Sequence, residues 1–238
     1  NTNAFIKKYQ SNLLSEQYKY YSSNFYNPTK VERATRLLSE VVDIIECLDL
    51  NYWLEGGTCL GAVRDGKFIP WDHDIDLGIK FESEQKMNLL LTQLKKKFNI
   101  KINRFSKKHK KKFGEYRLIK ISENKNIFNK IKEQILRNLG YKNDFILDLF
   151  IFYKQPLNED TNNLVYKYVV FNKVGYHEKE YLDSMNKILF YNREYNIPNN
   201  VESWLTTKYG EDWNFPKEQW HVNLDDKTLN LDPRKTIK

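Results

Sequence analysis

The sequence predicts an α/β (α+β) domain: a mixed β-sheet core flanked by helices, with a small, mostly helical, aromatic-rich C-terminal portion. Segments with helical spacing of apolar residues alternate along the chain with segments of strand spacing. The run FILDLFIFY at 145–153 is apolar except for Asp148, which is typical of a central strand covered on both faces. The 238 residues, 40% of them hydrophobic, suffice for one large domain with a real core.

The domain organisation follows from the same pattern. Residues 1–27 are polar and Tyr-rich with little periodicity, which predicts an N-terminal arm. Residues 28–155 carry the clearest alternation and form the expected core, and residues 156–238 complete the same domain. The chain begins with Asn and not Met, so we expect it to be one domain of a larger protein.

The elements are expected in the following order. Thr29 and Glu32 have the spacing of a capping box at the start of the first helix. The expected helical segments cover 30–49, 58–64, 83–98, 125–139 and 200–209. The expected strands cover 51–54, 74–80, 99–105, 115–121, 145–153, 164–171 and 187–191.

Composition excludes several classes of protein. A mean hydropathy of -0.72 and the lack of an apolar run near ~20 residues exclude a transmembrane helix. Two cysteines cannot build a disulfide framework, and no Cys/His set has zinc spacing. The net charge of +8 resides in residues 95–112, which hold ten Lys and Arg and no acid. The rest of the chain has a net charge of -2.

Residues 53–79 carry the chemistry. Gly56-Gly57 follows an expected strand, where glycine lets the backbone approach a phosphate and the next N–H groups can face it. Asp74 and Asp76 lie two apart on a strand, so both carboxylates leave the same face. Their repulsion favours a divalent cation with oxygen preference, Mg²⁺ or Mn²⁺. Asp148, alone in an apolar strand, is the natural third carboxylate, because a buried Asp is costly unless paired or bound to metal.

Each feature also has a structural interpretation. A Gly-Gly pair can be an ordinary turn, an Asp-x-Asp pair can lie on a solvated edge, and Asp148 can cap a neighbouring element. Their joint occurrence in this order is typical of the nucleotidyltransferase superfamily. It resembles in particular the LicD family, which includes bacterial phosphocholine transferases, fukutin and fukutin-related proteins. The resemblance lies in GGTCLGAVR at 56–64, IPWDHDID at 69–76, Asp148, and YGEDW at 209–213.

The resemblance implies a nucleotidyltransferase-like fold and a metal-dependent phosphotransferase. Such enzymes move a polyol phosphate such as ribitol phosphate, or phosphocholine, from a CDP-linked donor to a glycan or phosphopolymer hydroxyl, releasing CMP. The core 28–155 is then the catalytic core, and 156–238 the acceptor side. The implied catalytic residues are Asp72, Asp74, Asp76 and Asp148, of which the last three bind the metal. The implied donor and phosphate ligands are Gly56, Gly57, Thr58 and Arg64.

Several roles stay open at this level. Asp72 can bind a second metal or act as the general base, and Asp148 is the rival base. Trp71 and Trp213 are candidate acceptor contacts, although packing roles account for them equally well. His73, between the two aspartates, is expected to point the other way as a structural residue.

Two alternative functions remain, and the role of the basic segment 95–112 is also open. A true nucleotidyltransferase would use the same glycines and aspartates. A nucleic-acid-binding module would use the Lys-rich run 107–112, but no recognised motif accompanies that run, so no nucleic-acid partner is expected. The segment 95–112 can instead hold an anionic acceptor or an anionic membrane surface, or simply be solvated. We expect a cytoplasmic protein, peripheral at the inner face of the membrane.

Overall fold

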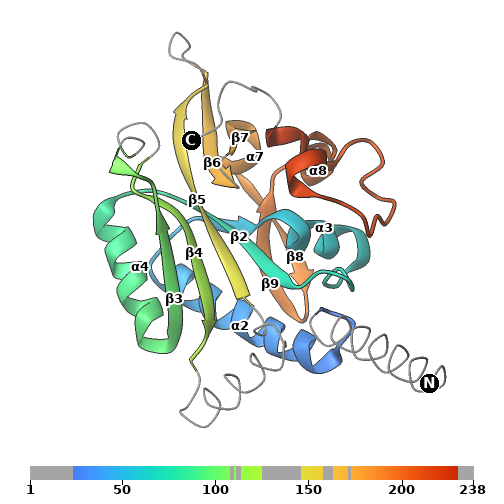
Figure 1. The fold of residues 1–238 in the computed structure, drawn as a ribbon, viewed down its shortest axis with the longest axis horizontal. Coiled ribbons are helices and arrows are strands. Elements are labelled where there is room, and N and C mark those ends of the chain that lie inside the picture. Colours follow the sequence, from blue (N-terminus) through green and yellow to red (C-terminus); the bar gives the residue numbers. More distant parts are fainter. Residues whose placement is uncertain are drawn as a thin grey trace, which may run out of the picture.

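The computed structural model describes residues 24–107, 110, 114–124, 146–157, 163–170 and 173–229. Figure 1 shows a mixed sheet with helices around it, and the α/β (α+β) class predicted from the sequence is confirmed. The predicted arm at 1–27 falls almost entirely outside the described residues, as does the predicted helix at 125–139. The division at residue 155 stays a prediction.

The described strands form a 7-stranded sheet and a separate hairpin. They are β1 (Tyr52–Leu54), β2 (Asp74–Lys80), β3 (Phe98–Arg104), β4 (Tyr116–Glu123), β5 (Ile146–Pro156), β6 (Leu164–Val170), β7 (Lys173–Glu178), β8 (Met185–Phe190) and β9 (Arg193–Pro198). The main order is β1-β2-β5-β4-β3, in which only β2 and β5 run parallel. The far end of β5 leaves this order to pair with β6, which pairs with β7, while β8 and β9 form the hairpin.

The described helices surround this sheet, with α2 and α4 covering one flank (Figure 1). They are α2 (Pro28–Cys47), α3 (Gly56–Asp65), α4 (Glu84–Lys97), α7 (Lys179–Leu182), α8 (Val201–Tyr209), α9 (Val222–Asp225) and the 3-10 helix η1 (Lys227–Leu229). The capping box predicted at Thr29 is wrong. The N-cap of α2 is Asn27, whose side chain accepts a hydrogen bond from the Thr29 N–H at 3.0 Å. Pro28 accounts for the difference, because proline favours the first helical position and lacks an N–H.

Alternation within the central strands separates the core from the polar face. In β2, Ile75, Leu77 and Ile79 are fully buried and pack in one cluster with the apolar residues of α2 and α4. Each such side chain stabilises the fold by roughly 1.5–3 kcal/mol. Because successive side chains of a strand point to opposite faces, Asp74 and Asp76 project from the other side. The apolar face of the sheet thus packs into the core, and the carboxylates lie together on the opposite face.

The C-terminal portion differs from the prediction of a mostly helical segment. It contains β6, β7, β8 and β9 as well as α7 and α8. The strands β7 and β9 were not predicted, since each has six residues and little alternation of its own. Both are held as partners in hairpins, where cross-strand contacts and burial decide the conformation and not local propensity. Within the described chain, no helix combines the length and the apolar character needed to cross a membrane.

Candidate active site

The four predicted aspartates meet at one cavity. Asp72 lies in the turn before β2, Asp74 and Asp76 on β2, and Asp148 on β5. The parallel register places Asp76 directly beside Asp148. All four line a cavity of ≈ 720 Å³ on the polar face of the sheet. The sequence therefore predicted correctly that these side chains come together.

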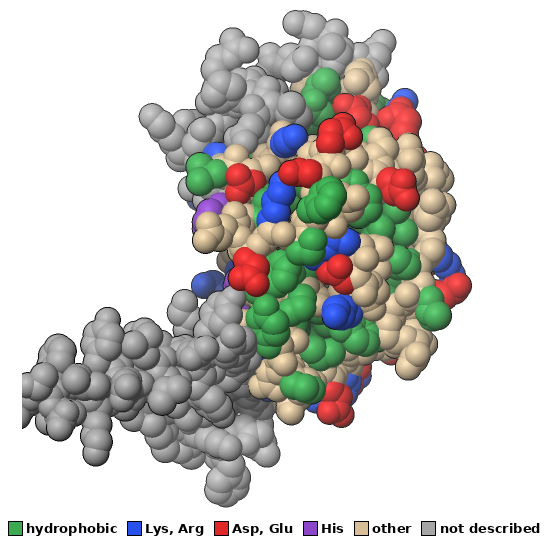
Figure 2. Space-filling model, turned by 90° about the vertical axis from the view of Figure 1, so that its right-hand side faces the viewer, with side chains coloured by type: hydrophobic (Ala, Val, Ile, Leu, Met, Phe, Trp, Pro, Cys, Tyr) green, Lys and Arg blue, Asp and Glu red, His purple; other side chains and the backbone are tan. Residues whose placement is uncertain are grey.

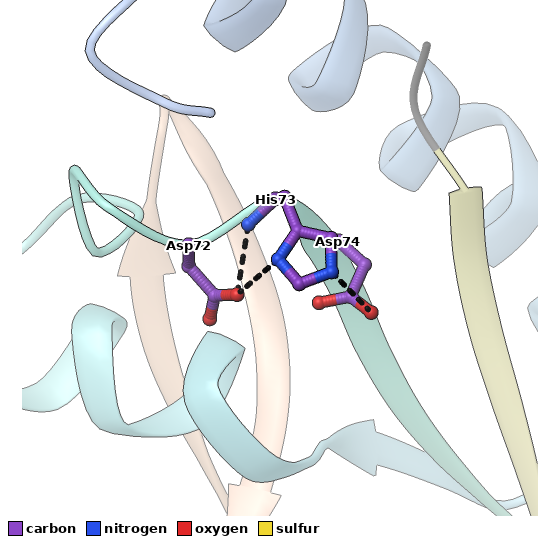
Figure 3. A group of neighbouring side chains, drawn as sticks. All are labelled: Asp72, His73 and Asp74. Atoms are coloured by element: carbon purple, nitrogen blue, oxygen red, sulfur yellow. Dashed lines mark hydrogen bonds and ion pairs between the residues drawn. The ribbon is translucent and has the colours of Figure 1, made fainter. Parts of the chain in front are cut away.

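His73 does not behave as predicted. Its imidazole is exposed and lies between two carboxylates, with Nδ1 3.7 Å from Asp72 Oδ1 and Nε2 3.9 Å from Asp74 Oδ2 (Figure 3). One candidate ligand atom from each of the three residues lies within 4.8 Å of the others. The expectation that His73 points away is wrong because β2 begins only at Asp74, so strand alternation does not extend to residue 73. Lys30 of α2 fixes this turn by donating to the His73 carbonyl at 2.8 Å.

The two glycines make room for the carboxylates. Gly56 has a φ of +53°, and a Cβ there would collide with Asp76 Oδ2. A Cβ on Gly57 would collide with Asp72 Oδ2. The Gly57 N–H also donates to Asp76 Oδ2 at 3.3 Å. Any larger residue at either position would displace an aspartate of the cavity.

Thr58 contacts the backbone of Asp76, and Arg64 contacts the side chain of Asp65. The Thr58 hydroxyl is buried and accepts a hydrogen bond from the Asp76 N–H at 2.9 Å. The Arg64 guanidinium lines the cavity, but two of its nitrogens donate to the Asp65 carboxylate at 3.0 and 2.7 Å. Of the four predicted phosphate ligands, Gly57 and Arg64 face the cavity, whereas Gly56 and Thr58 lie behind it. Their contacts to phosphate stay predictions.

Burial and mutual repulsion dominate the electrostatics of the aspartates. Burial, followed by the charges of Asp74, Asp72 and Asp148, raises the pKa of Asp76 well above its usual range. Burial and the neighbouring Asp74 raise the pKa of Asp72 to about 7. Burial also raises the pKa of Asp148, although Lys120 opposes that shift. Additional positive charge among these carboxylates would favour their ionised forms.

A divalent cation suits this donor set. Asp74, Asp76 and Asp148 present carboxylates to the same cavity from two adjacent strands, and carboxylate oxygen is the ligand type that Mg²⁺ and Mn²⁺ prefer. Asp72, His73 and Asp74 offer a second set of candidate metal ligands at the start of β2. Metal binding at either set stays a prediction.

The comparison with protein families agrees with this geometry. Residues 49–200 match the family model described as LicD/FKTN/FKRP, nucleotidyltransferase domain. The chain belongs to the LicD/FKTN/FKRP family. The resemblance read from GGTCLGAVR and IPWDHDID is confirmed, and with it the nucleotidyltransferase-like fold.

Relatives within the family carry names that refer to ribitol phosphate. Human ribitol 5-phosphate transferase FKRP is 57% identical over 42 residues, which cover 18% of this chain and 8% of that protein. Mouse ribitol-5-phosphate transferase FKTN is 25% identical over 195 residues, covering 79% of this chain and 35% of that protein. The match thus spans well under half the length of either relative. Among solved structures, ANT(2″)-Ia in complex with adenylyl-2″-tobramycin has a TM-score of 0.40 and 12% identity, covering 79% of this chain and 81% of that chain.

The family segment YGEDW lies beside the aspartates. Trp71 and Trp213, the two candidate acceptor contacts, both line the cavity and are half-buried against the core. The structural alternative, in which the C-terminal aromatic residues seal the core, holds for Trp204, which is fully buried. Phe215, by contrast, is 66% exposed at the cavity. The aromatic segment therefore divides into core residues and cavity residues.

Sequence reasoning missed two cationic residues of β4. Lys120 pairs in register with Asp148, and its Nζ donates to both carboxylate oxygens at 3.1 and 2.9 Å. The signal was present, since Lys120 interrupts an apolar strand just as Asp148 does. Arg117 also lines the cavity, and it lies at a β-bulge, because the register with β3 passes from Leu118 to Tyr116 and skips it. A bulge of this kind re-aims a side chain and leaves no reliable sequence signal.

The basic segment 95–112 is described only in part. Lys97 forms an ion pair with Glu40, and Arg104 and Lys110 both pair with Glu115. Most of the Lys-rich run 107–112 lies outside the described residues. Its proposed contact with an anionic acceptor or membrane stays a prediction, as does the cytoplasmic location.

Proposed function

We propose that this chain is a metal-dependent phosphotransferase. It moves a polyol phosphate such as ribitol phosphate from a CDP-linked donor to a hydroxyl of a glycan or phosphopolymer and releases CMP. The observation that carries the proposal is the convergence of Asp72, Asp74, Asp76 and Asp148 on one cavity in a chain of the LicD/FKTN/FKRP family. The names of FKRP and FKTN favour ribitol phosphate as the transferred group, with phosphocholine as the second candidate.

Asp74, Asp76 and Asp148 would hold Mg²⁺ or Mn²⁺. The fit rests on three carboxylates that face one cavity, on the raised pKa values of Asp76 and Asp148, and on glycines that leave space for the side chains. When bound, the cation offsets negative charge on the phosphate oxygens. Gly57 and Arg64 line the same cavity and would contact the donor phosphates, whereas Gly56 and Thr58 would act by holding Asp76 in place.

Asp72 is the better candidate for the general base. Both oxygens of Asp148 accept hydrogen bonds from Lys120, and its side chain is only 9% exposed. The Asp72 side chain is 25% exposed, and its Oδ1 accepts a hydrogen bond from the His73 backbone N–H. An acceptor hydroxyl entering the cavity can therefore approach Asp72 without displacing Lys120, which holds both oxygens of Asp148. Asp72 would take the proton as the hydroxyl oxygen attacks phosphorus.

A screen for CMP release tests the proposal. The protein is incubated with CDP-ribitol, CDP-glycerol or CDP-choline and a glycan acceptor, with Mg²⁺ or Mn²⁺ or with EDTA. Free CMP and a new phosphodiester on the glycan are expected, with loss of turnover in EDTA. The variants Asp74→Asn and Asp76→Asn should lose roughly 100-fold or more in kcat, the range typical for removal of a transition-state stabiliser.

Two outcomes would contradict this reading. A nucleotide attached to the acceptor would establish the alternative, a true nucleotidyltransferase. Near-normal turnover of Asp76→Asn in saturating Mg²⁺ would remove the metal assignment.

A further inference from the structure

A second group of charges lies behind the cavity and is fully enclosed. Glu55, Lys208 and Asp226 are 2%, 4% and 0% exposed. The Lys208 Nζ lies 3.3 Å from Glu55 Oε1 and 3.0 Å from Asp226 Oδ2. Burial of three charged residues is costly even when they are paired, so their placement is informative.

Their positions in the chain connect two parts of the site. Glu55 directly precedes Gly56-Gly57, and its Oε2 accepts a hydrogen bond from Trp53 Nε1 at 2.6 Å. Lys208 lies in the last turn of α8, and Asp226 directly follows α9. Lys208 and Asp226 therefore flank the segment 209–225, which we call the aromatic loop. Its two ends meet at their ion pair, as in compact loops whose ends lie close together.

The aromatic loop forms one wall of the cavity. Trp213, Phe215 and Trp220 line it, and the Tyr209 and Trp220 rings lie 5.0 Å apart. The chain after α8 passes beside α3, the helix that begins with the glycine pair (Figure 1). Figure 2 views this side of the molecule and shows hydrophobic side chains gathered across the middle of the face, between scattered charges. Flat aromatic rings at the edge of a polar cavity suit the apolar face of a sugar ring.

Further hydrogen bonds fasten the C-terminal end of the loop. Asp226 Oδ1 accepts from the Thr228 N–H at 2.9 Å and from the Thr228 hydroxyl at 2.6 Å. The Tyr168 hydroxyl accepts from Lys208 Nζ at 3.1 Å and lies 2.8 Å from Thr228 Oγ1. Glu55 Oε1 also lies 3.5 Å from His177 Nε2, so the Glu55 carboxylate is enclosed between Lys208 and His177.

We propose that Lys208 and Asp226 are positioning residues that clasp the base of the aromatic loop and, through Glu55, fix it against the glycine turn. The clasp sets the distance between the aromatic wall, where a sugar ring of the acceptor binds, and the aspartates that act on the donor. The identity of the bound acceptor rests on the proposed function, whereas the mechanical role of the clasp does not.

Hydrogen exchange and kinetics of Asp226→Asn test the clasp. The substitution keeps the shape of the side chain and an oxygen for Thr228, but it removes the charge that faces Lys208. Amide exchange in 209–225 should accelerate at least tenfold while β2 and β5 keep their protection. The acceptor KM should rise about tenfold, with the donor KM unchanged and kcat at saturating acceptor within threefold. Lys208→Arg, which keeps the charge, should stay near the parent protein in both measurements.

Controls separate the possible failures. Glu194→Gln breaks the exposed ion pair with Lys187 and should change neither measurement. Lys208→Met can fail to fold because it leaves two buried carboxylates without their cation. Tyr168→Phe removes one hydrogen bond to Lys208 and therefore serves as the milder variant.

The proposal would be overturned if amide exchange in 209–225 of Asp226→Asn were unchanged, or if the donor KM and the acceptor KM rose in parallel. Absence of CMP release from every donor would instead defeat the proposed function and leave the exchange experiment decisive for the clasp.

Discussion

Gly57 owes its identity to a neighbouring side chain and not to its own backbone. Among the described glycines, positive φ values occur at Gly56, Gly66, Gly114 and Gly210, so the backbone of Gly57 is open to any residue. What excludes a larger residue is the Asp72 carboxylate, into which a Cβ would project. Gly66 presents the opposite case, with a φ of +63° and open space around a Cβ. Gly57 is therefore required because the site has no space for a Cβ, whereas Gly66 is required by its own backbone conformation.

Substituting these glycines should separate activity from stability. Gly57→Ala should displace Asp72 and lower kcat/KM for transfer at least tenfold, with little change in the free energy of unfolding. Gly66→Ala should cost about 1 kcal/mol of unfolding free energy, since alanine resists the left-handed region, and leave kcat/KM unchanged. CMP release and urea denaturation of both variants measure this contrast. Equal activity in the two variants would show that Asp72 tolerates displacement.

At the scale of single elements, three adjacent strands place one charged residue each in a common row. The registers align Asp76 of β2 with Asp148 of β5, and Asp148 with Lys120 of β4. Alternation in the sequence predicted which face each aspartate occupies, because the aliphatic neighbours define the core side. The order of the strands was not predictable from alternation, since pairing between distant segments depends on the whole sheet. Lys120 was therefore missed although its strand was predicted.

Other features of the elements have no local signal. The bulge at Arg117 depends on how β3 and β4 pair, and the orientation of His73 depends on where β2 begins. The clasp joins Glu55 to Lys208, about 150 positions later in the chain, a contact that no spacing rule indicates. The site residues between 56 and 76 were found because they lie close together in sequence, and Asp148 because it stands alone in an apolar strand. The residues that support these site residues come from other elements of the chain and were not found from the sequence.

The bulge predicts a role for Arg117 in donor binding. A guanidinium turned into the cavity suits a donor phosphate, with which it can form two charge-assisted hydrogen bonds. Arg117→Gln should raise the donor KM at least tenfold, in line with the ~1.5–3 kcal/mol of a hydrogen bond to a charged group, and leave the acceptor KM unchanged. Arg104→Gln, on the neighbouring strand outside the cavity lining, is the matched control. An unchanged donor KM in Arg117→Gln would remove this residue from the donor site.

At the scale of the whole molecule, the fold places its most costly charges where function needs them. Asp76 is half-buried beside three other carboxylates, and its raised pKa reflects surroundings that oppose its charge. A protein selected for stability alone would not retain this arrangement. In the buried trio, Lys208 lies between the carboxylates of Glu55 and Asp226, whereas Asp76 in the cavity is surrounded by further carboxylates. If the proposed cation binds among these carboxylates, its binding should stabilise the folded domain.

Thermal unfolding should reveal that contribution. At a cation concentration 100 times its Kd, binding to the folded state alone adds about 2.7 kcal/mol, which for a chain of this size raises Tm by roughly 5–10 °C. Asp76→Asn removes one repelling charge and keeps an oxygen for the Gly57 N–H, so its Tm in EDTA should exceed that of the parent protein. The same variant should lose most of the rise with Mn²⁺, because one carboxylate ligand is gone. Calorimetry in EDTA and in Mn²⁺, with Ca²⁺-free buffer throughout, compares the four conditions. Two results would contradict a cation at Asp76: a Tm of the parent protein that Mn²⁺ does not raise, or an Asp76→Asn variant that keeps the full rise in Tm. Either result would show that the repulsion among these aspartates is relieved in another way.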